Sequence, residues 1–172
     1  MVSQVWPFGR SMWILASILV VGSFHPLSGM ASDTNWSVRE GPDPVSGGQR
    51  CLLESAEKTV DDGQTTTSMR VVFTGDAFVV ITDSKVDLSY PDVGIRVDSQ
   101  DAVPVDRMLG ETSVVFDSDV DGLVERFARG TELRVALGFW PTWPQTETVV
   151  TSFSLIGFTR AHKEFLECSA AA

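Results

Sequence analysis

The sequence predicts a mainly β domain, built as a compact β-sandwich or a partly closed barrel. One helix is expected at its edge, and a second, C-terminal helix is expected to be stapled by a disulfide. The main observation is a series of short segments with alternating apolar residues, separated by turns rich in Gly, Asp and Pro. Only two segments have the apolar spacing of a helix. Apolar residues make up 43% of the 172 residues, which is enough for a packed core.

The first 31 residues have the pattern of a signal peptide. Arg10 precedes an apolar run over residues 13–21, and the small residues Gly29 and Ala31 stand just before a cleavage point ahead of Ser32. The run is shorter than the about 20 apolar residues that span a bilayer. We therefore expect cleavage, a periplasmic or secreted protein, and no stable membrane insertion.

The remaining chain has the length of one domain, which we assign to residues 32–168, with residues 169–172 as a short, fraying tail. It holds 12 Lys and Arg against 23 Asp and Glu, because the leader contributes one Arg and no acidic residue. A net charge of −11 repels nucleic acid and anionic lipid. We interpret the scattered acidic residues as a solvated surface, and we expect a monomer or a weak oligomer.

Alternation and turn residues predict the strands of the N-terminal part. A short extended piece around Trp36 leads into a Pro- and Gly-rich loop over residues 41–48. Gly75 predicts a tight hairpin, because glycine readily adopts the positive φ that such a turn requires. Residues 100–110, which contain Pro104, are predicted to form a loop. The predicted strands here are 51–59, 65–73, 77–82, 86–90, 93–97 and 112–116.

Residues 119–128 have the spacing of an amphipathic helix. Their apolar residues fall at positions i, i+3, i+4 and i+7 and form one stripe: Val120, Leu123, Val124 and Phe127. Asp117 or Ser118 can cap the start of this helix, and Gly130 follows its end. Two further strands, over residues 133–139 and 149–153, are predicted from alternation.

The last helix is predicted over residues 158–168. Phe158, Ala161, Phe165 and Cys168 share one face of it, so that Cys168 points toward the core. In an exported chain the two cysteines, Cys51 and Cys168, are most simply a disulfide. A metal pair or a reactive thiol are the alternatives, and a metal pair would need further ligands in a mature chain that holds one histidine, His162.

Asp117, Asp119 and Asp121, followed by Gly122, resemble the opening of a calcium-binding loop. The twelfth position, where such a loop carries a bidentate Glu, is Ala128. Asp residues are also favoured at the start of a helix by capping and by the helix dipole. We therefore predict no metal ion and no cofactor, and keep calcium as the alternative for these three carboxylates.

The segment from Phe139 to Pro144 is the most unusual local sequence in the domain. Its two prolines exclude a central strand and predict a stiff loop or sheet edge that presents Trp140 and Trp143. Rigid aromatic side chains are good interface anchors and sugar platforms. We predict that Trp140 and Trp143 bind a partner, helped by Phe139 or Thr142. The alternative is that both indoles fold back over the core.

No motif in the sequence predicts an enzyme. His162 would have to serve any nucleophile–histidine–acid triad, and no nucleophile-elbow sequence accompanies it. We interpret His162 as a partly exposed structural residue beside Phe158 and Phe165. A hydrolase with carboxylates that the sequence does not identify remains an alternative.

The stretch Ser152-Phe-Ser-Leu-Ile-Gly-Phe-Thr-Arg-Ala161, with Trp36 and Cys51 upstream, resembles the invasion-associated locus B family of exported proteobacterial proteins. That resemblance implies a β-rich domain with a periplasmic or envelope role and no known catalysis. Together with the two tryptophans, it leads us to expect an envelope protein that binds another envelope protein. The alternative is a module that binds a glycan or another small ligand through Trp140 and Trp143.

Overall fold

The computed structural model describes residues 1–3, 35–141 and 147–171. Asp33–Ala172 form one compact unit. The signal peptide expected over residues 1–31 lies outside the described residues, apart from its first three. No helix in the described ranges is long and apolar enough to cross a membrane.

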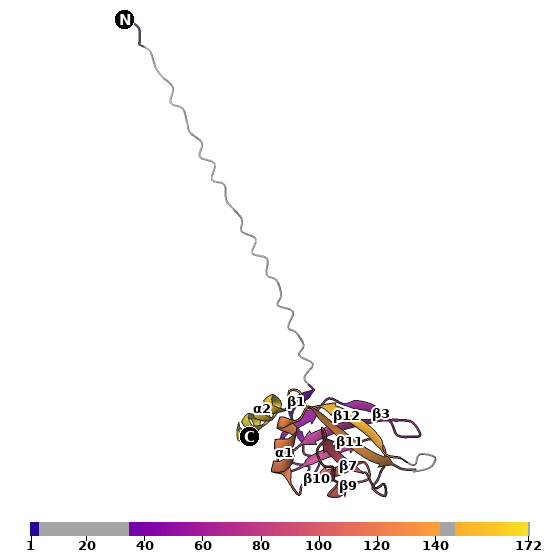
Figure 1. Cartoon of the computed structure of the whole chain (residues 1–172). Coiled ribbons are helices and arrows are strands. Elements are labelled where there is room, and N and C mark those ends of the chain that lie inside the picture. The colour runs from indigo at the N-terminus through magenta and orange to yellow at the C-terminus, as the bar shows by residue number, and fades with distance from the viewer. Residues whose placement is uncertain (4–34, 142–146, 172) are drawn as a thin grey trace. The chain divides into compact units, whose positions relative to one another are not determined.

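The first sheet consists of antiparallel strands from the N-terminal part of the domain (Figure 1). Its order is β1-β2-β4-β5-β10-β9, and β3 pairs with β4 beside this path. The strands are β1 (Trp36–Pro42), β2 (Gln49–Ser55), β3 (Lys58–Asp61), β4 (Thr66–Phe73), β5 (Phe78–Thr82), β9 (Arg107–Leu109) and β10 (Ser113–Phe116). The predicted hairpin is confirmed: Gly75, with a φ of 97°, lies in the turn between β4 and β5.

The second sheet is built on the long strand β11 (Glu132–Phe139). Its order is β12-β11-β7-β8, and β6 also pairs with β11. The other members are β6 (Val86–Asp87), β7 (Gly94–Val97), β8 (Val103–Pro104) and β12 (Val149–Ser154). Apolar residues of both sheets share one core, which confirms the mainly β, sandwich-like fold: Leu53, Val71, Phe73, Phe78, Val80, Val114 and Phe116 of the first sheet, and Ile95, Val97, Leu133, Val135, Leu137 and Phe153 of the second.

The structure corrects two strand predictions and one loop prediction. The strand expected over 51–59 is broken at Ala56 and Glu57, and the halves on either side of the break, β2 and β3, both pair with β4. The strand expected over 86–90 is only the two-residue β6, because β11 offers partners to Val86 and Asp87 alone. The loop expected over 100–110 contains β8 and β9, which find partners in β7 and β10.

Helix α1 (Val120–Arg129) and helix α2 (Phe158–Ala171) lie close to the predicted positions. The N-cap of α1 is Asp119, one residue after Ser118 and two after Asp117, the two expected caps. Its carboxylate accepts a hydrogen bond from the Gly122 amide at 3.1 Å. Gly130 ends α1 as predicted. Helix α2 extends beyond its predicted end at residue 168 and continues to Ala171.

Aromatic rings from β1, from the β4–β5 hairpin and from both helices meet in one cluster. The Trp36 ring of β1 contacts Phe158 of α2 edge-on, with centroids 5.1 Å apart, and Phe127 of α1 at 6.1 Å. Phe127 in turn contacts Phe78 of β5 at 4.6 Å. The Trp36 indole N–H donates to the Ser154 carbonyl oxygen at 2.8 Å, so its polar atom is satisfied inside the core.

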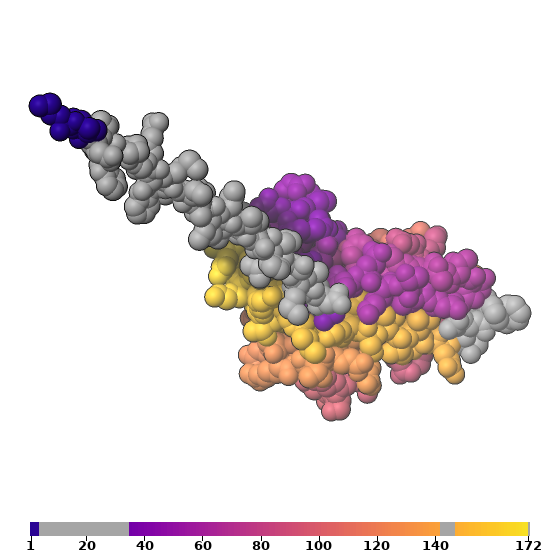
Figure 2. Space-filling view, turned by 90° about the horizontal axis from the view of Figure 1, so that it is seen from above, coloured from indigo at the N-terminus to yellow at the C-terminus, as the bar shows by residue number. Residues whose placement is uncertain are grey.

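The predicted disulfide between Cys51 and Cys168 is confirmed, and both cysteines are used in it. It joins β2 to α2 across 117 positions of sequence, with the two Cα atoms 6.1 Å apart. Helix α2, drawn yellow, lies beside β1 and β2 (Figures 1 and 2). The C-terminal helix is therefore fixed to the first sheet both by its apolar face and by a covalent bond.

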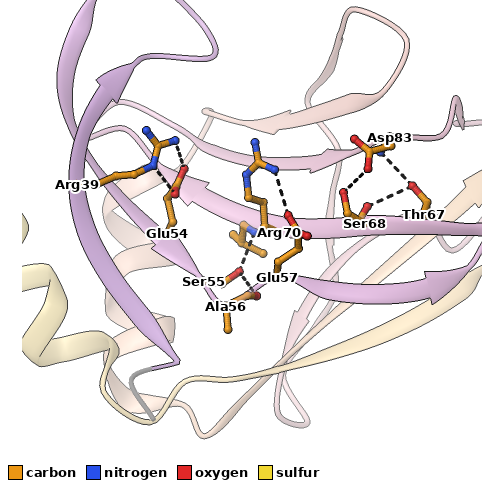
Figure 3. A network of polar contacts seen from close by, with 10 residues as sticks. Arg39, Glu54, Ser55, Ala56, Glu57, Thr67, Ser68, Arg70 and Asp83 are labelled. Atoms are coloured by element: carbon orange, nitrogen blue, oxygen red, sulfur yellow. Dashed lines mark hydrogen bonds and ion pairs between the residues drawn. The ribbon is translucent and has the colours of Figure 1, made fainter. Parts of the chain in front are cut away.

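The outer face of the first sheet carries charges that are paired with one another (Figure 3). Arg39 of β1 binds Glu54 of β2 through two hydrogen bonds of 2.6 Å. Ser68 of β4 donates to Asp83 at 2.5 Å. At the break after β2, the Ser55 hydroxyl accepts from the Val71 amide at 2.9 Å. The polar groups drawn in Figure 3 therefore satisfy one another, while Ala77, Val79 and Val115 form a small buried apolar cluster on the β5–β10 side of the same sheet.

We predict that replacing both cysteines with serine lowers the free energy of unfolding by about 2–5 kcal/mol. The bridge closes a very long loop, so its loss restores much conformational freedom to the unfolded chain. Urea unfolding of the double variant and of the oxidised protein measures the difference. Equal stabilities would show that the helix is held by packing alone.

We also predict that acid destabilises the domain through His162. Its ring stacks on Phe158 with centroids 5.7 Å apart, and burial lowers its pKa below the ordinary 6.5. Between pH 6.5 and the lower pKa of folded His162, the unfolded chain takes up a proton at this residue more readily than the folded protein does. The contribution of neutral His162 to the free energy of unfolding is therefore complete above pH 6.5 and is lost as the pH falls.

The variant His162→Gln cannot take up this proton. Its unfolding free energy should fall less than that of the parent protein between pH 7 and pH 5, whatever its absolute stability. Urea unfolding across this range tests the comparison. Identical slopes for the two proteins would contradict the assignment.

Candidate functional site

The structure describes two of the four predicted binding residues, and it places one of them in the core and the other at the surface. Phe139, the last residue of β11, is 4% exposed and belongs to the core, so it cannot contact a partner at the surface. Trp140, the next residue, is 62% exposed. Thr142 and Trp143 lie outside the described residues. The alternation of β11 explains the contrast, since successive side chains of a strand point to opposite faces.

The backbone holds Trp140 in a fixed place. Its N–H donates to the Lys85 carbonyl oxygen at 2.8 Å, which continues the pairing of β6 with β11 by one residue. The Val86 N–H in turn donates to the Glu111 carbonyl oxygen at 2.8 Å. Three segments far apart in the sequence are thereby tied side by side: the start of β6, the turn between β9 and β10, and the end of β11.

Gly138 allows β6 and its following turn to approach β11. A Cβ atom at Gly138 would overlap the Tyr90 ring and would stand 2.8 Å from the Asp87 carbonyl oxygen. Any larger residue would push the 87–90 segment away from the sheet. Sequence reasoning missed this function of Gly138, although a glycine inside an alternating strand is a known sign of close approach by another segment.

A surface pocket of about 650 Å³ opens beside Trp140. Its apolar members include Leu88, which is 40% exposed, and Met108. At its edge the Lys85 ammonium and the Glu111 carboxylate form an exposed ion pair of 2.9 Å. We name this the Trp140 pocket, and its lining residues are Lys85, Val86, Asp87, Leu88, Ser89, Met108, Gly110, Glu111 and Trp140.

The Trp140 pocket is suited to binding. An exposed indole and neighbouring aliphatic side chains gain free energy when they are removed from water, and the polar rim can orient a ligand. Asp87, whose carboxylate accepts a hydrogen bond from the Ser89 amide at 2.8 Å, fixes the turn that presents Leu88. The residues that line the pocket come from segments far apart in the sequence, between residues 85 and 140. Sequence analysis therefore predicted only one of them, Trp140.

The three candidate calcium ligands have structural positions at or just before α1, and Asp121 lies in its first turn. Asp117 pairs with Arg107 at 2.9 Å, and Asp119 caps α1. Within the part of the chain that the structure describes, Glu40, Cys51 and Cys168 are the group of three whose ligand atoms come within 4.8 Å of one another. Two of these are the sulfurs of the disulfide, so this group binds no ion in the oxidised protein.

The carboxyl groups with shifted pKa values are held in the ionised form. Hydrogen bonds from the Ser84 hydroxyl, at 2.5 Å, and from the Thr65 amide lower the pKa of Asp62. Burial raises the pKa of Asp43, but the Val45 amide, Ser46 and Arg50 outweigh it and leave the pKa lowered. A general acid needs the opposite shift. These residues fasten turns, and they give no support to a carboxyl-based hydrolase.

Comparisons with known proteins add no assignment: no family model, no curated protein and no solved structure matches this chain. The resemblance to the invasion-associated locus B family stays a prediction from the 152–161 stretch, Trp36 and Cys51.

We predict opposite outcomes for alanine at two neighbouring aromatic residues. Phe139→Ala should cost about 3–5 kcal/mol of unfolding free energy, because it leaves a cavity in the core. Trp140→Ala should change it by about 0.5 kcal/mol or less, because the indole is mostly in water. Urea unfolding of the two variants measures both. A large loss on changing Trp140 would show that the indole supports the fold rather than a ligand.

Proposed function

We propose that this protein is an exported binding module of the cell envelope and that it uses the Trp140 pocket to bind another protein. The observation that carries the proposal is an indole that is 62% exposed although its backbone is fixed by the sheet. A residue whose backbone is already ordered loses less conformational entropy when a partner covers its side chain. An exposed, anchored tryptophan is therefore what an interface hot spot requires.

The composition of the pocket supports a protein partner. Leu88 and Met108 stand with Trp140 as its apolar members, and the Lys85–Glu111 ion pair lies at the rim. Apolar anchors inside a polar rim are the usual anatomy of a protein interface. The acidic surface elsewhere limits unspecific association with other acidic components.

Export is supported by the leader sequence and by the disulfide. Residues 1–31 carry the signal-peptide pattern, and disulfides persist in oxidising compartments outside the cytoplasm. A periplasmic or secreted location is compatible with both.

A second candidate ligand for the same pocket is a glycan. Asp87, Ser89 and Glu111 line it beside the indole, and their oxygens can receive the hydroxyl groups of a sugar whose C–H face stacks on Trp140. Titration with soluble glycan fragments, followed by indole fluorescence in a Trp143→Phe background, separates the two ligands. Quenching that disappears in Trp140→Phe would favour the glycan over the protein partner.

A photo-crosslinking residue at Leu88 tests the protein partner in living cells that express the chain. We expect discrete heavier bands, identified by mass spectrometry, because Leu88 borders the pocket and is exposed. The matched control is the same residue at Leu166, which is 53% exposed on α2 and takes no part in the pocket.

The bands should be strong from Leu88, weak from Leu166, and weakened in the Leu88 probe when Trp140→Ala is added. Equal bands from both positions would indicate random contact. No bands from a folded, exported protein would contradict the proposal.

A further inference from the structure

A second hollow lies on the outer face of the second sheet, away from the Trp140 pocket. The strand register places one row of small or aliphatic residues across four strands: Val150 of β12, Ala136 of β11, Gly94 of β7 and Pro104 of β8. All four line a cavity of about 400 Å³. Its volume falls within the ~300–1,000 Å³ of typical small-molecule sites.

The floor of this hollow consists of residues with no side chain or a very short one. Gly94 has a φ of 155°, and a Cβ atom there would overlap the carbonyl oxygen of Val103, so β8 can pair with β7 only if this position is glycine. Ala136 lies beside it in the register with the shortest side chain after glycine. Val150 forms a wall of the hollow and is 60% exposed, so this apolar surface remains in water.

Two arginines stand at one end of the hollow. Arg96 of β7 and Arg134 of β11 are direct cross-strand partners, and both line the cavity. Like charges in that position are about 5 Å apart at Cβ and destabilise the pair. Arg134 is compensated by Glu132 at 2.7 Å. Arg96 is exposed, and its guanidinium makes no hydrogen bond or ion pair with any described residue.

The acidic group that also lines the hollow is Asp92, which precedes Gly94 and so lies on the side away from Arg96. The hollow therefore has a charge gradient: an uncompensated guanidinium at one end, an aliphatic floor and wall in the middle, and a carboxylate at the far end. Arg96, Lys58 and Arg126 are the described cationic side chains that form no ion pair with a carboxylate, and of these three Arg96 lines the hollow.

We propose that this hollow binds a small amphiphilic anion, whose carboxylate or phosphate group pairs with Arg96 and Arg134 and whose aliphatic part lies over Ala136 and Gly94 against Val150. A guanidinium is the side chain best shaped for both kinds of anionic group. The anion relieves the repulsion between the two arginines, and its aliphatic part removes Val150 from water. This site does not depend on the function proposed for the Trp140 pocket.

Nuclear magnetic resonance titration with octanoate and octyl phosphate tests the proposal on the mature, oxidised protein. We expect progressive shifts of the amide signals of Gly94, Arg96, Ala136 and Val150 at ligand concentrations up to about 10 mM, a range that detects millimolar affinity. Octyltrimethylammonium, with the same chain and the opposite charge, should bind at least about tenfold more weakly. The ratio of the affinities for octanoate and octyl phosphate shows whether a carboxylate or a phosphate ester is preferred.

Variants separate the two halves of the site. Arg96→Gln should weaken octanoate binding about tenfold or more, and Ala136→Leu, which fills the floor, should abolish it. If Ala136→Leu fails to fold, Val150→Asp places a negative charge on the exposed wall and should have the same effect. Arg160→Gln, an exposed arginine on α2, is the control and should leave binding unchanged.

Three results would overturn the proposal. One is the absence of shifts at these four residues over the whole concentration range. Another is equal affinity for the cationic and the anionic ligands. The third is unchanged octanoate binding in folded Arg96→Gln, which would place the ligand elsewhere on the domain.

Discussion

The contact of Trp36 with Phe127 and Phe158 is the interaction on which the rest of the structure depends. It joins the first strand to both helices, and Phe127 extends it to Phe78 in the β4–β5 hairpin. Each such ring pair contributes about 0.5–1.5 kcal/mol beyond the burial of its surface. The disulfide then fixes α2 to β2 close to this cluster. One end of the sandwich is therefore closed by aromatic packing and a covalent bond.

The Trp140 pocket lies at a distance from this closed end. Two residues separate the end of α1 from the start of β11, and the eight residues of β11 carry the chain about 25 Å away from the helix before Trp140 leaves the sheet. The same strand anchors Phe139 in the core and pairs with β6, which sets the pocket floor. The packed core at one end of the sandwich supplies the stability of the domain. The exposed indole at the other end therefore lowers the free energy of unfolding only a little.

The elements that local chemistry specifies were predictable. Gly75 marked the hairpin, the stripe ending at Phe127 marked α1, and the face of α2 that carries Cys168 led to the disulfide. The short strands β8 and β9 were missed because their pairing comes from partners distant in sequence. The alternation of β11 already placed Phe139 toward the core, which its prediction as a binding residue ignored. The Trp140 pocket and the Arg96–Arg134 pair depend on strand register, which no local pattern reveals.

The central claim is that the indole of Trp140 is a binding anchor and that Trp36 is a structural one. The most direct test uses isotope-labelled protein that comprises residues 32–172. It follows the indole N–H signals of Trp140 and Trp36 while an unlabelled extract of the cell envelope is added. The account predicts that the Trp140 signal shifts or broadens together with the Leu88 amide, and that the buried Trp36 signal does not change. An unchanged Trp140 signal, or equal changes in both indoles, would contradict it.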